Sequence, residues 1–206
     1  MRTIGWFFLG GISAVVLVVL AAAGFVLSAH GFSAREQPTS AERWIARLMR
    51  DSAIPGEARR RTNPIPDTPE VLAEARAHWA DHCATCHAND GSGDTQIGKR
   101  TYPPSPDMRL PETQKLTDGE LFYIIQNGVR LTAMPAWAGN SEHNEHDSWK
   151  LVRFIRHLPD LTFEEKKQME HLNPRSPEEI QEEEQEQRFL KGESDNDPSI
   201  EHHHHH

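Results

Sequence analysis

Both cysteines of the 206-residue chain lie in one short motif, Cys83-Ala84-Thr85-Cys86-His87. This C-x-x-C-H spacing is typical of covalent c-type haem attachment. At a helix end, the spacing presents two thiols and one imidazole to the same edge of a porphyrin. The thiols of Cys83 and Cys86 can then add to the two vinyl groups, while His87 becomes the proximal iron ligand. The motif therefore predicts one covalently attached haem c.

Three other chemistries use similar residues. A thioredoxin-like redox pair also has C-x-x-C spacing, but it needs a βαβ pattern, which is absent from this sequence. A zinc site usually has four ligands at preferred spacings, and the chain has no second cysteine pair. A lone metal site formed by His87 with His78 or His82 is the third alternative, and nothing else in the sequence supports it.

A haem iron in an electron carrier normally takes a second axial ligand, for which Met134 is the best candidate. It stands in the stretch Thr132–Trp137, between two predicted helices, and Pro135 stiffens that loop. A His/Met ligand pair raises the reduction potential relative to His/His. The competing candidates are Met108, His78, His82, His143, His146 and His157.

The elements that must position these residues are helices. Apolar spacing, capping residues and terminal Gly or Pro predict helices over residues 68–83, 117–128 and 147–158. Residues 88–115 are rich in Gly and Pro, which predicts an ordered loop. No strand pattern is present, so the compact domain over residues 67–159 is expected to be all-α.

The amino-terminal segment contains 26 residues without a charge, residues 4–29. A helix needs about 20 apolar residues to cross a bilayer, whereas the apolar region of a cleaved signal peptide has roughly 7–15. We therefore expect a transmembrane anchor rather than a cleaved leader. The arginines that follow the span favour the opposite orientation by the positive-inside rule. The haem motif needs an oxidising compartment, so we place residues 1–3 at the cytoplasmic end and the haem domain on the extracytoplasmic side.

Two further segments flank the compact domain. Residues 30–66 are predicted to contain an amphipathic helix, with Thr39 and Glu42 as its capping box, followed by a linker. The basic, apolar-faced helix can lie on the membrane surface or pack on the domain or on another subunit. Residues 160–192 are predicted to form a helical extension that becomes acidic, and residues 193–206 have a disorder-type composition.

Charge is distributed unevenly along the chain, whose formal net charge is −9. Residues 1–66 hold 8 basic and 4 acidic residues, whereas residues 178–206 hold 2 and 10. The negative balance argues against nucleic acid as a partner. The acidic run 178–187 is either a solvated helix face or a surface for a basic partner. Similarly, His202–His206 is either an expression tag or a native metal-binding tract.

Four stretches, HCATCHANDGSG, LTDGELFYIIQNGV, AMPAW and DSWKLVRFIRHLP, follow one another in this order. Together they resemble a class I cytochrome c domain over residues 67–159. The domain is most similar to the single-haem domains of bacterial membrane-anchored c-type cytochromes. The resemblance implies a cytochrome c-like helical fold around one covalent haem, with Cys83 and Cys86 as thioether residues, His87 as proximal ligand and Met134 as distal ligand.

The resemblance also implies particular contacts. The first and last helices of the domain are expected to cross, which would pair Val71, Leu72 and Ala75 with Leu151, Val152 and Ile155. A proline carbonyl, at Pro103 or Pro104, is expected to accept a hydrogen bond from the His87 imidazole and to orient the ring. Three aromatic residues are expected to lie in the core, with a role as walls of the haem as the alternative: Trp137, Trp149 and Tyr123.

The predicted function is that of a membrane-anchored carrier of single electrons between redox partners, with no catalytic residue of its own. The expected partners are the lipid bilayer, through residues 4–29, and a soluble redox protein or a respiratory complex. The expected location is the bacterial inner membrane, as a single-pass protein with a periplasmic haem domain. Two alternatives are a cytochrome subunit of a larger dehydrogenase or oxidase, and a haem or metal sensor in which Met134 dissociates.

Overall fold

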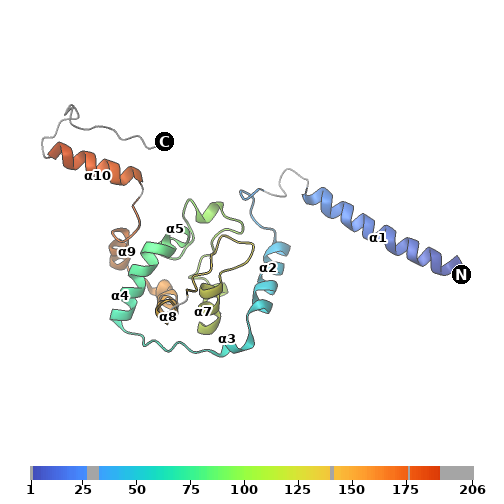
Figure 1. Ribbon diagram of the computed structural model, residues 1–206, viewed down its shortest axis with the longest axis horizontal. Helices are drawn as coiled ribbons and strands as arrows, with labels where there is room; N and C mark the ends of the chain where they lie inside the picture. The colour runs from blue at the N-terminus through green and yellow to red at the C-terminus, as the bar shows by residue number, and fades with distance from the viewer. Residues whose placement is uncertain (1, 27–32, 140–141, 176, 191–206) are drawn as a thin grey trace.

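A computed structural model describes residues 2–26, 33–139, 142–175 and 177–190. Over these residues the secondary structure consists of helices joined by loops, without a strand, which confirms the predicted all-α class. The helices that matter below are labelled in Figure 1: α1 (Arg2–Val26), α2 (Ser40–Ala53), α3 (Gly56–Arg60), α4 (Pro69–His78), α5 (Ala84–His87), α7 (Asp118–Asn127), α8 (Glu142–His157), α9 (Phe163–Glu170) and α10 (Pro177–Leu190).

The centre of the domain is the contact between α4 and α8, which pack across each other (Figure 1). Thr68 caps α4 by accepting a hydrogen bond from the backbone N–H of Val71 at 3.3 Å, and Pro69 occupies its first turn. The chain continues through a π-helical turn, Trp79–Cys83, into α5. The predicted crossing of the first and last helices is confirmed, because Ala75 of α4 is buried and so is the stripe Leu151, Val152 and Ile155 of α8.

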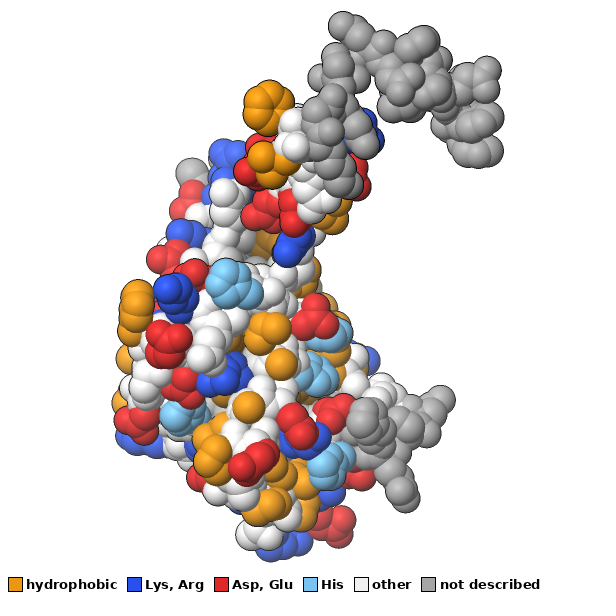
Figure 2. Space-filling view, turned by 90° about the vertical axis from the view of Figure 1, so that its left-hand side faces the viewer, with side chains coloured by type: hydrophobic (Ala, Val, Ile, Leu, Met, Phe, Trp, Pro, Cys, Tyr) orange, Lys and Arg blue, Asp and Glu red, His pale blue; other side chains and the backbone are white. Residues whose placement is uncertain are grey.

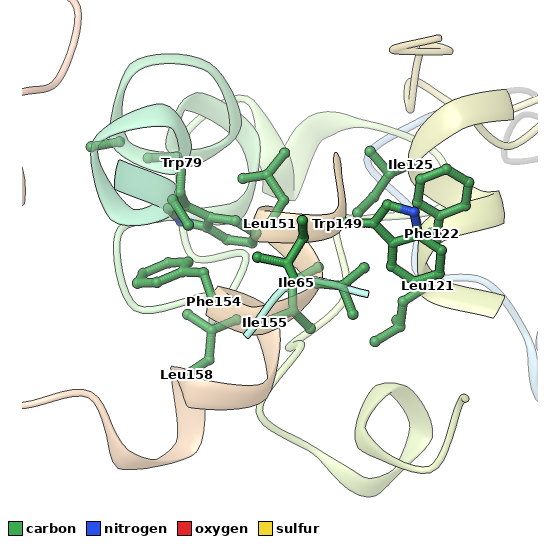
Figure 3. Close-up of a cluster of buried hydrophobic side chains, with 14 of the residues drawn as sticks. Ile65, Trp79, Leu121, Phe122, Ile125, Trp149, Leu151, Phe154, Ile155 and Leu158 are labelled. Atoms are coloured by element: carbon green, nitrogen blue, oxygen red, sulfur yellow. The ribbon is translucent and has the colours of Figure 1, made fainter. Parts of the chain in front are cut away.

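Aromatic side chains make up much of the core (Figure 3). Trp79 and Phe154 lie with ring centroids 5.4 Å apart, and Phe122 stacks on Trp149 at 4.0 Å. Trp149 is thus a core residue, as expected, while Trp137 is partly buried against the same cluster. Offset and tilted ring pairs of this kind stabilise a core beyond the area that they bury. Trp79 connects this core to the motif helix, because its ring also lies beside the ring of His87.

Most predicted helices form close to the expected bounds. Thr117 and Glu120 make a reciprocal capping box at the start of α7, and Gly128 ends that helix with φ +65°. Thr162 and Glu165 do the same for α9. Helix α8 begins at Glu142 rather than at the predicted residue 147. Its first turn is polar and carries no apolar stripe, so hydrophobic spacing missed it.

Residues 54–66 differ from the predicted linker, because they pack on the domain. Ile54 and Ile65 are buried, and Arg153 donates two hydrogen bonds, of 2.6 and 2.9 Å, to the carbonyl of Ile65. Helix α3 lies against α7, where Arg59 pairs with Glu120 at 3.2 Å. This Pro-containing stretch shows neither helical nor strand periodicity, so its packing could not be predicted from the spacing of its residues.

The amino-terminal helix α1 runs from Arg2 to Val26. In the part of the chain whose residues are described, no helix is both long enough and apolar enough to span a membrane. Residues 27–29, the end of the predicted helical extension at residues 191–192, and the tract His202–His206 lie outside the described residues. A broad face of the domain that includes α4 and α9 carries interspersed acidic, basic and histidine side chains (Figure 2).

Candidate haem site

The two thiols of the motif lie on adjacent turns where the π-helical segment meets α5. Cys83 and Cys86 are both free and half-buried. Burial raises the pKa of the Cys83 thiol to about 12, so that thiol is protonated at neutral pH. A redox-active C-x-x-C pair needs a thiolate with a lowered pKa. The environment of Cys83 therefore argues against thiol–disulfide chemistry. It fits a thiol that forms a covalent bond other than a disulfide.

His87 ends the motif helix beside the core. Its ring centroid lies 5.8 Å from that of Trp79, and burial lowers the pKa of the imidazole, which favours the neutral, metal-ligating form. The Nδ1 atom is buried and has no hydrogen-bond partner. The predicted acceptor at Pro103 or Pro104 is thus wrong in this structure, since the Pro103 carbonyl instead accepts from Thr101 Oγ1 at 3.1 Å.

The loop after the motif fixes the end of α5. The indole Nε1 of Trp79 donates to the carbonyl of Ala88 at 3.0 Å, and the backbone N–H of Gly93 donates to the carbonyl of His87 at 2.9 Å. A Cβ atom at Gly98 would lie 2.2 Å from the carbonyl oxygen of Cys86, so the loop approaches closely enough to require glycine there. These contacts satisfy carbonyl groups at a helix end and hold the motif in one orientation.

Met134 is half-buried, in a largely exposed loop that is attached to the end of α7. Its carbonyl accepts from the N–H of Val129 at 3.1 Å, and its own N–H donates to Thr132 Oγ1 at 3.1 Å. Three residues later, the N–H of Trp137 donates to the carbonyl of Ile125 at 3.1 Å. Main-chain bonds on both sides of Met134 therefore fix the path of the loop.

Gly128 is the residue at which the end of α7 meets the Met134 loop. Its φ is +65°, and a Cβ atom there would lie 2.6 Å from the carbonyl carbon of Pro135 and 2.7 Å from the carbonyl oxygen of Met134. Sequence reasoning identified Gly128 only as the end of a helix. The close approach of the Met134 loop is a tertiary contact, and a glycine after Asn127 was the only local signal of it.

The substitution Gly128→Ala is expected to displace the Met134 loop and to destabilise the domain by about 1–3 kcal/mol, because the added methyl group meets backbone and the residue must keep a left-handed φ. Thermal unfolding and the visible spectrum of the purified protein measure the two effects. Gly56→Ala is the matched control, since the nearest atom to its Cβ is the end of the Arg60 side chain at 3.4 Å. Equal melting temperatures for the two variants would contradict the prediction.

One ring contact brings the Met134 loop to the motif. Trp137 and His82 meet edge to face, with centroids 5.7 Å apart; His82 immediately precedes Cys83, and Trp137 follows Met134 by three residues. Among the competing ligands, the Met108 side chain packs against the core and His157 Nε2 lies 3.0 Å from Glu165. The side chain of His143 lies outside the described residues.

The remaining histidines do not build a separate metal centre in the described part of the chain. The rings of His78 and His82 are 4.9 Å apart, but no third His, Cys, Asp or Glu joins any such group among the residues searched. By contrast, the motif supplies two unmodified thiols, a neutral imidazole and an orphaned buried ring nitrogen. This set fits a covalently attached haem.

A comparison with protein families matches residues 70–155 to the family described as Cytochrome C oxidase, cbb3-type, subunit III. The matched segment is a class I c-type cytochrome domain. Such a domain carries covalently bound haem c and works in electron transfer. No curated protein matches the chain significantly. The cytochrome domain thus includes the motif, the Met134 loop and the two crossed helices, and the flanking helices α1, α2, α9 and α10 lie outside the matched residues.

Proposed function

We propose that this chain is a membrane-anchored, single-haem cytochrome that passes single electrons between redox partners. Cys83 and Cys86 would hold the haem through thioether bonds, and His87 and Met134 would bind its iron. The observation that carries the proposal is the motif turn itself, where two free thiols and a neutral, half-buried imidazole lie within five residues beside the family-matched core.

The haem supplies the one-electron chemistry, an iron that alternates between Fe(II) and Fe(III). The polypeptide supplies the geometry. Trp79 and Gly98 fix the motif turn, and Gly128 fixes the loop of Met134 on the other segment. With both segments held in this way, His87 and Met134 would each be presented to the iron from a fixed position, which suits electron transfer.

We infer membrane attachment through residues 4–29, with the haem domain on the periplasmic side of a bacterial inner membrane. The support is the uncharged 26-residue stretch and the exposure of large apolar side chains between Ile12 and Phe25 of α1. Isolated apolar side chains are common on surfaces, but a helix exposing them all round is typical of a lipid environment.

Attachment and orientation are tested on the full chain, produced with its haem in a bacterial host. The haem-stained band is expected to stay in the membrane pellet after a carbonate wash, and protease added to spheroplasts is expected to remove it. Intact mass should include residues 4–29, since cleavage would release them. A haem-stained band in the soluble fraction, or a band resistant to protease until the spheroplasts are lysed, would overturn the anchor or its orientation, respectively.

A second candidate is a cytochrome subunit within a larger oxidase. The specific observation in its favour is the description of the matched family, which is that of an oxidase subunit. In this case the chain is expected to co-purify with a catalytic subunit, and His87→Ala is expected to abolish turnover of the complex. Recovery of the chain alone, under mild detergent, from membranes with full oxidase activity favours the free carrier.

A further inference from the structure

Helix α2 exposes its whole apolar face. The four large side chains of this face are Trp44, Ile45, Leu48 and Met49, which are 65%, 48%, 51% and 62% exposed. No residue of α2 is buried. Contiguous apolar side chains on one face of an otherwise polar helix usually mark a surface that another molecule or a membrane covers. The apolar face of α2 is therefore a contact surface.

Helix α2 is attached to the haem domain at both of its ends. Near the first turn, the Tyr102 hydroxyl donates to Glu42 Oε1 at 2.8 Å. At the other end Ile54 is buried, and the Arg59 side chain donates to the carbonyls of Ile54 and Asp51. Whatever covers α2 is thus positioned relative to the haem domain.

Basic side chains occupy the opposite, polar side of this helix. Arg43, Arg47 and Arg50 recur at helical spacing on the polar side of α2. Close to its amino end is an open hollow of about 630 Å³, and its lining consists of Ser33, Ala34, Arg35, Lys99 and Arg100. Asp94 pairs with Lys99, one of the three cations of this lining. The hollow has a surplus of positive charge and suits an anionic group.

Chain connectivity keeps α2 close to the end of α1. Ser40 follows Val26 by 14 residues, and an extended chain of that length spans at most roughly 50 Å. If α1 is anchored in a bilayer, as proposed above, α2 is within reach of the bilayer surface. A basic helix with Trp and Leu on its apolar face has the composition of helices that lie in the lipid interface.

We propose that the apolar face of α2 lies in the surface of an anionic bilayer and that lipid phosphate groups occupy the hollow lined by Arg35, Lys99 and Arg100. This inference rests on the proposed membrane anchoring and deepens it. Because α2 is fixed to the haem domain by Tyr102 and Ile54, the contact sets one orientation of the domain above the membrane. Redox partners in the same membrane then meet a defined side of the haem domain.

The test uses the full haem-loaded chain in lipid nanodiscs. Because Cys83 and Cys86 are held in thioethers, an introduced cysteine is the only thiol available to an environment-sensitive fluorophore. Leu48→Cys places the probe on the apolar face, and Ala46→Cys, which is 200° away around the helix, is the matched control. With phosphatidylglycerol in the disc, the Leu48 probe is expected to shift to the blue and to be quenched by spin-labelled lipid, whereas the Ala46 probe remains water-exposed.

The charge requirement is tested with Lys99→Gln/Arg100→Gln in the Leu48→Cys background. Each basic residue near an anionic surface contributes the equivalent of about a fivefold change in the equilibrium. The pair is therefore expected to lower the ratio of docked to undocked helix roughly 25-fold. Lys115→Gln/Lys167→Gln removes the same charge at exposed positions elsewhere and is expected to leave the ratio unchanged.

The outcomes separate this inference from the anchor. If the chain fails to enter nanodiscs at all, the anchor is wrong and the docking of α2 falls with it. If it enters but the Leu48 probe stays in water with anionic lipid, the anchor stands and the docking is overturned. A probe shielded equally in discs of zwitterionic lipid, or only on addition of a protein partner, also overturns it. Binding of inorganic phosphate at the hollow without any lipid dependence identifies a free-anion site instead.

Discussion

Replacing both Cys83 and Cys86 by serine is expected to abolish covalent haem, so that the haem stain on a denaturing gel falls to background. The chain has no other cysteine, and therefore no other residue able to form a thioether. The domain is also expected to lose stability, because a domain of this size buries a modest core of its own and a bound haem adds apolar interior. Gel staining, a pyridine haemochrome spectrum and thermal unfolding measure these effects.

The matched control is Thr85→Ser, which changes the exposed residue between the two cysteines and leaves both thiols in place. It is expected to carry haem at the wild-type level. Each single serine variant retains one thiol and is expected to carry less haem than the wild type but more than the double variant. Full haem staining in the double variant would overturn the assignment of the motif, and with it the entire interpretation of the site.

Replacing Met134 by leucine is expected to lower the reduction potential by about 0.1 V or more, within the range over which axial ligands set haem potentials. Leucine fills a similar volume but has no sulfur, so the loop can keep its path while one axial ligand is lost. The loop is fixed by the hydrogen bonds of Val129 and Trp137, which the substitution does not touch. Redox titration and the visible spectrum measure the effect.

Met108→Leu is the matched control for this experiment, because it removes the sulfur of the competing methionine, whose side chain packs against the core. Its spectrum and potential are expected to equal those of the wild type. If Met108→Leu shifts the potential and Met134→Leu does not, the distal ligand is Met108. Carbon monoxide provides a further check: the reduced wild type is expected not to respond, whereas a response would favour the sensor alternative.

Local interactions are the part of this protein that the sequence determined by itself. The capping box at Thr39 forms as predicted, and Thr117 and Thr162 start their helices in the same way, because each box joins residues three apart and needs no distant partner. The same locality explains why the motif is readable, since both thiols and the imidazole lie within five residues. Apolar spacing identified the stripes of α4 and α8, because the stripe on each helix has to be buried against something. The crossing of the two helices came from the resemblance to class I cytochrome c domains.

The tertiary structure alone decided how the two halves of the site are held. The close approach at Gly128 and the Trp79 hydrogen bond to Ala88 join residues six to nine apart, beyond the reach of helical spacing. The packing of residues 54–66 joins segments much farther apart, since Arg153 binds the carbonyl of Ile65. No periodicity records such contacts, and a glycine or a tryptophan has many structural uses. The sequence therefore specified which groups do the chemistry, and long-range packing specified where the loop of Met134 lies against the motif, because side-chain volume and backbone approach are settled only when distant segments meet.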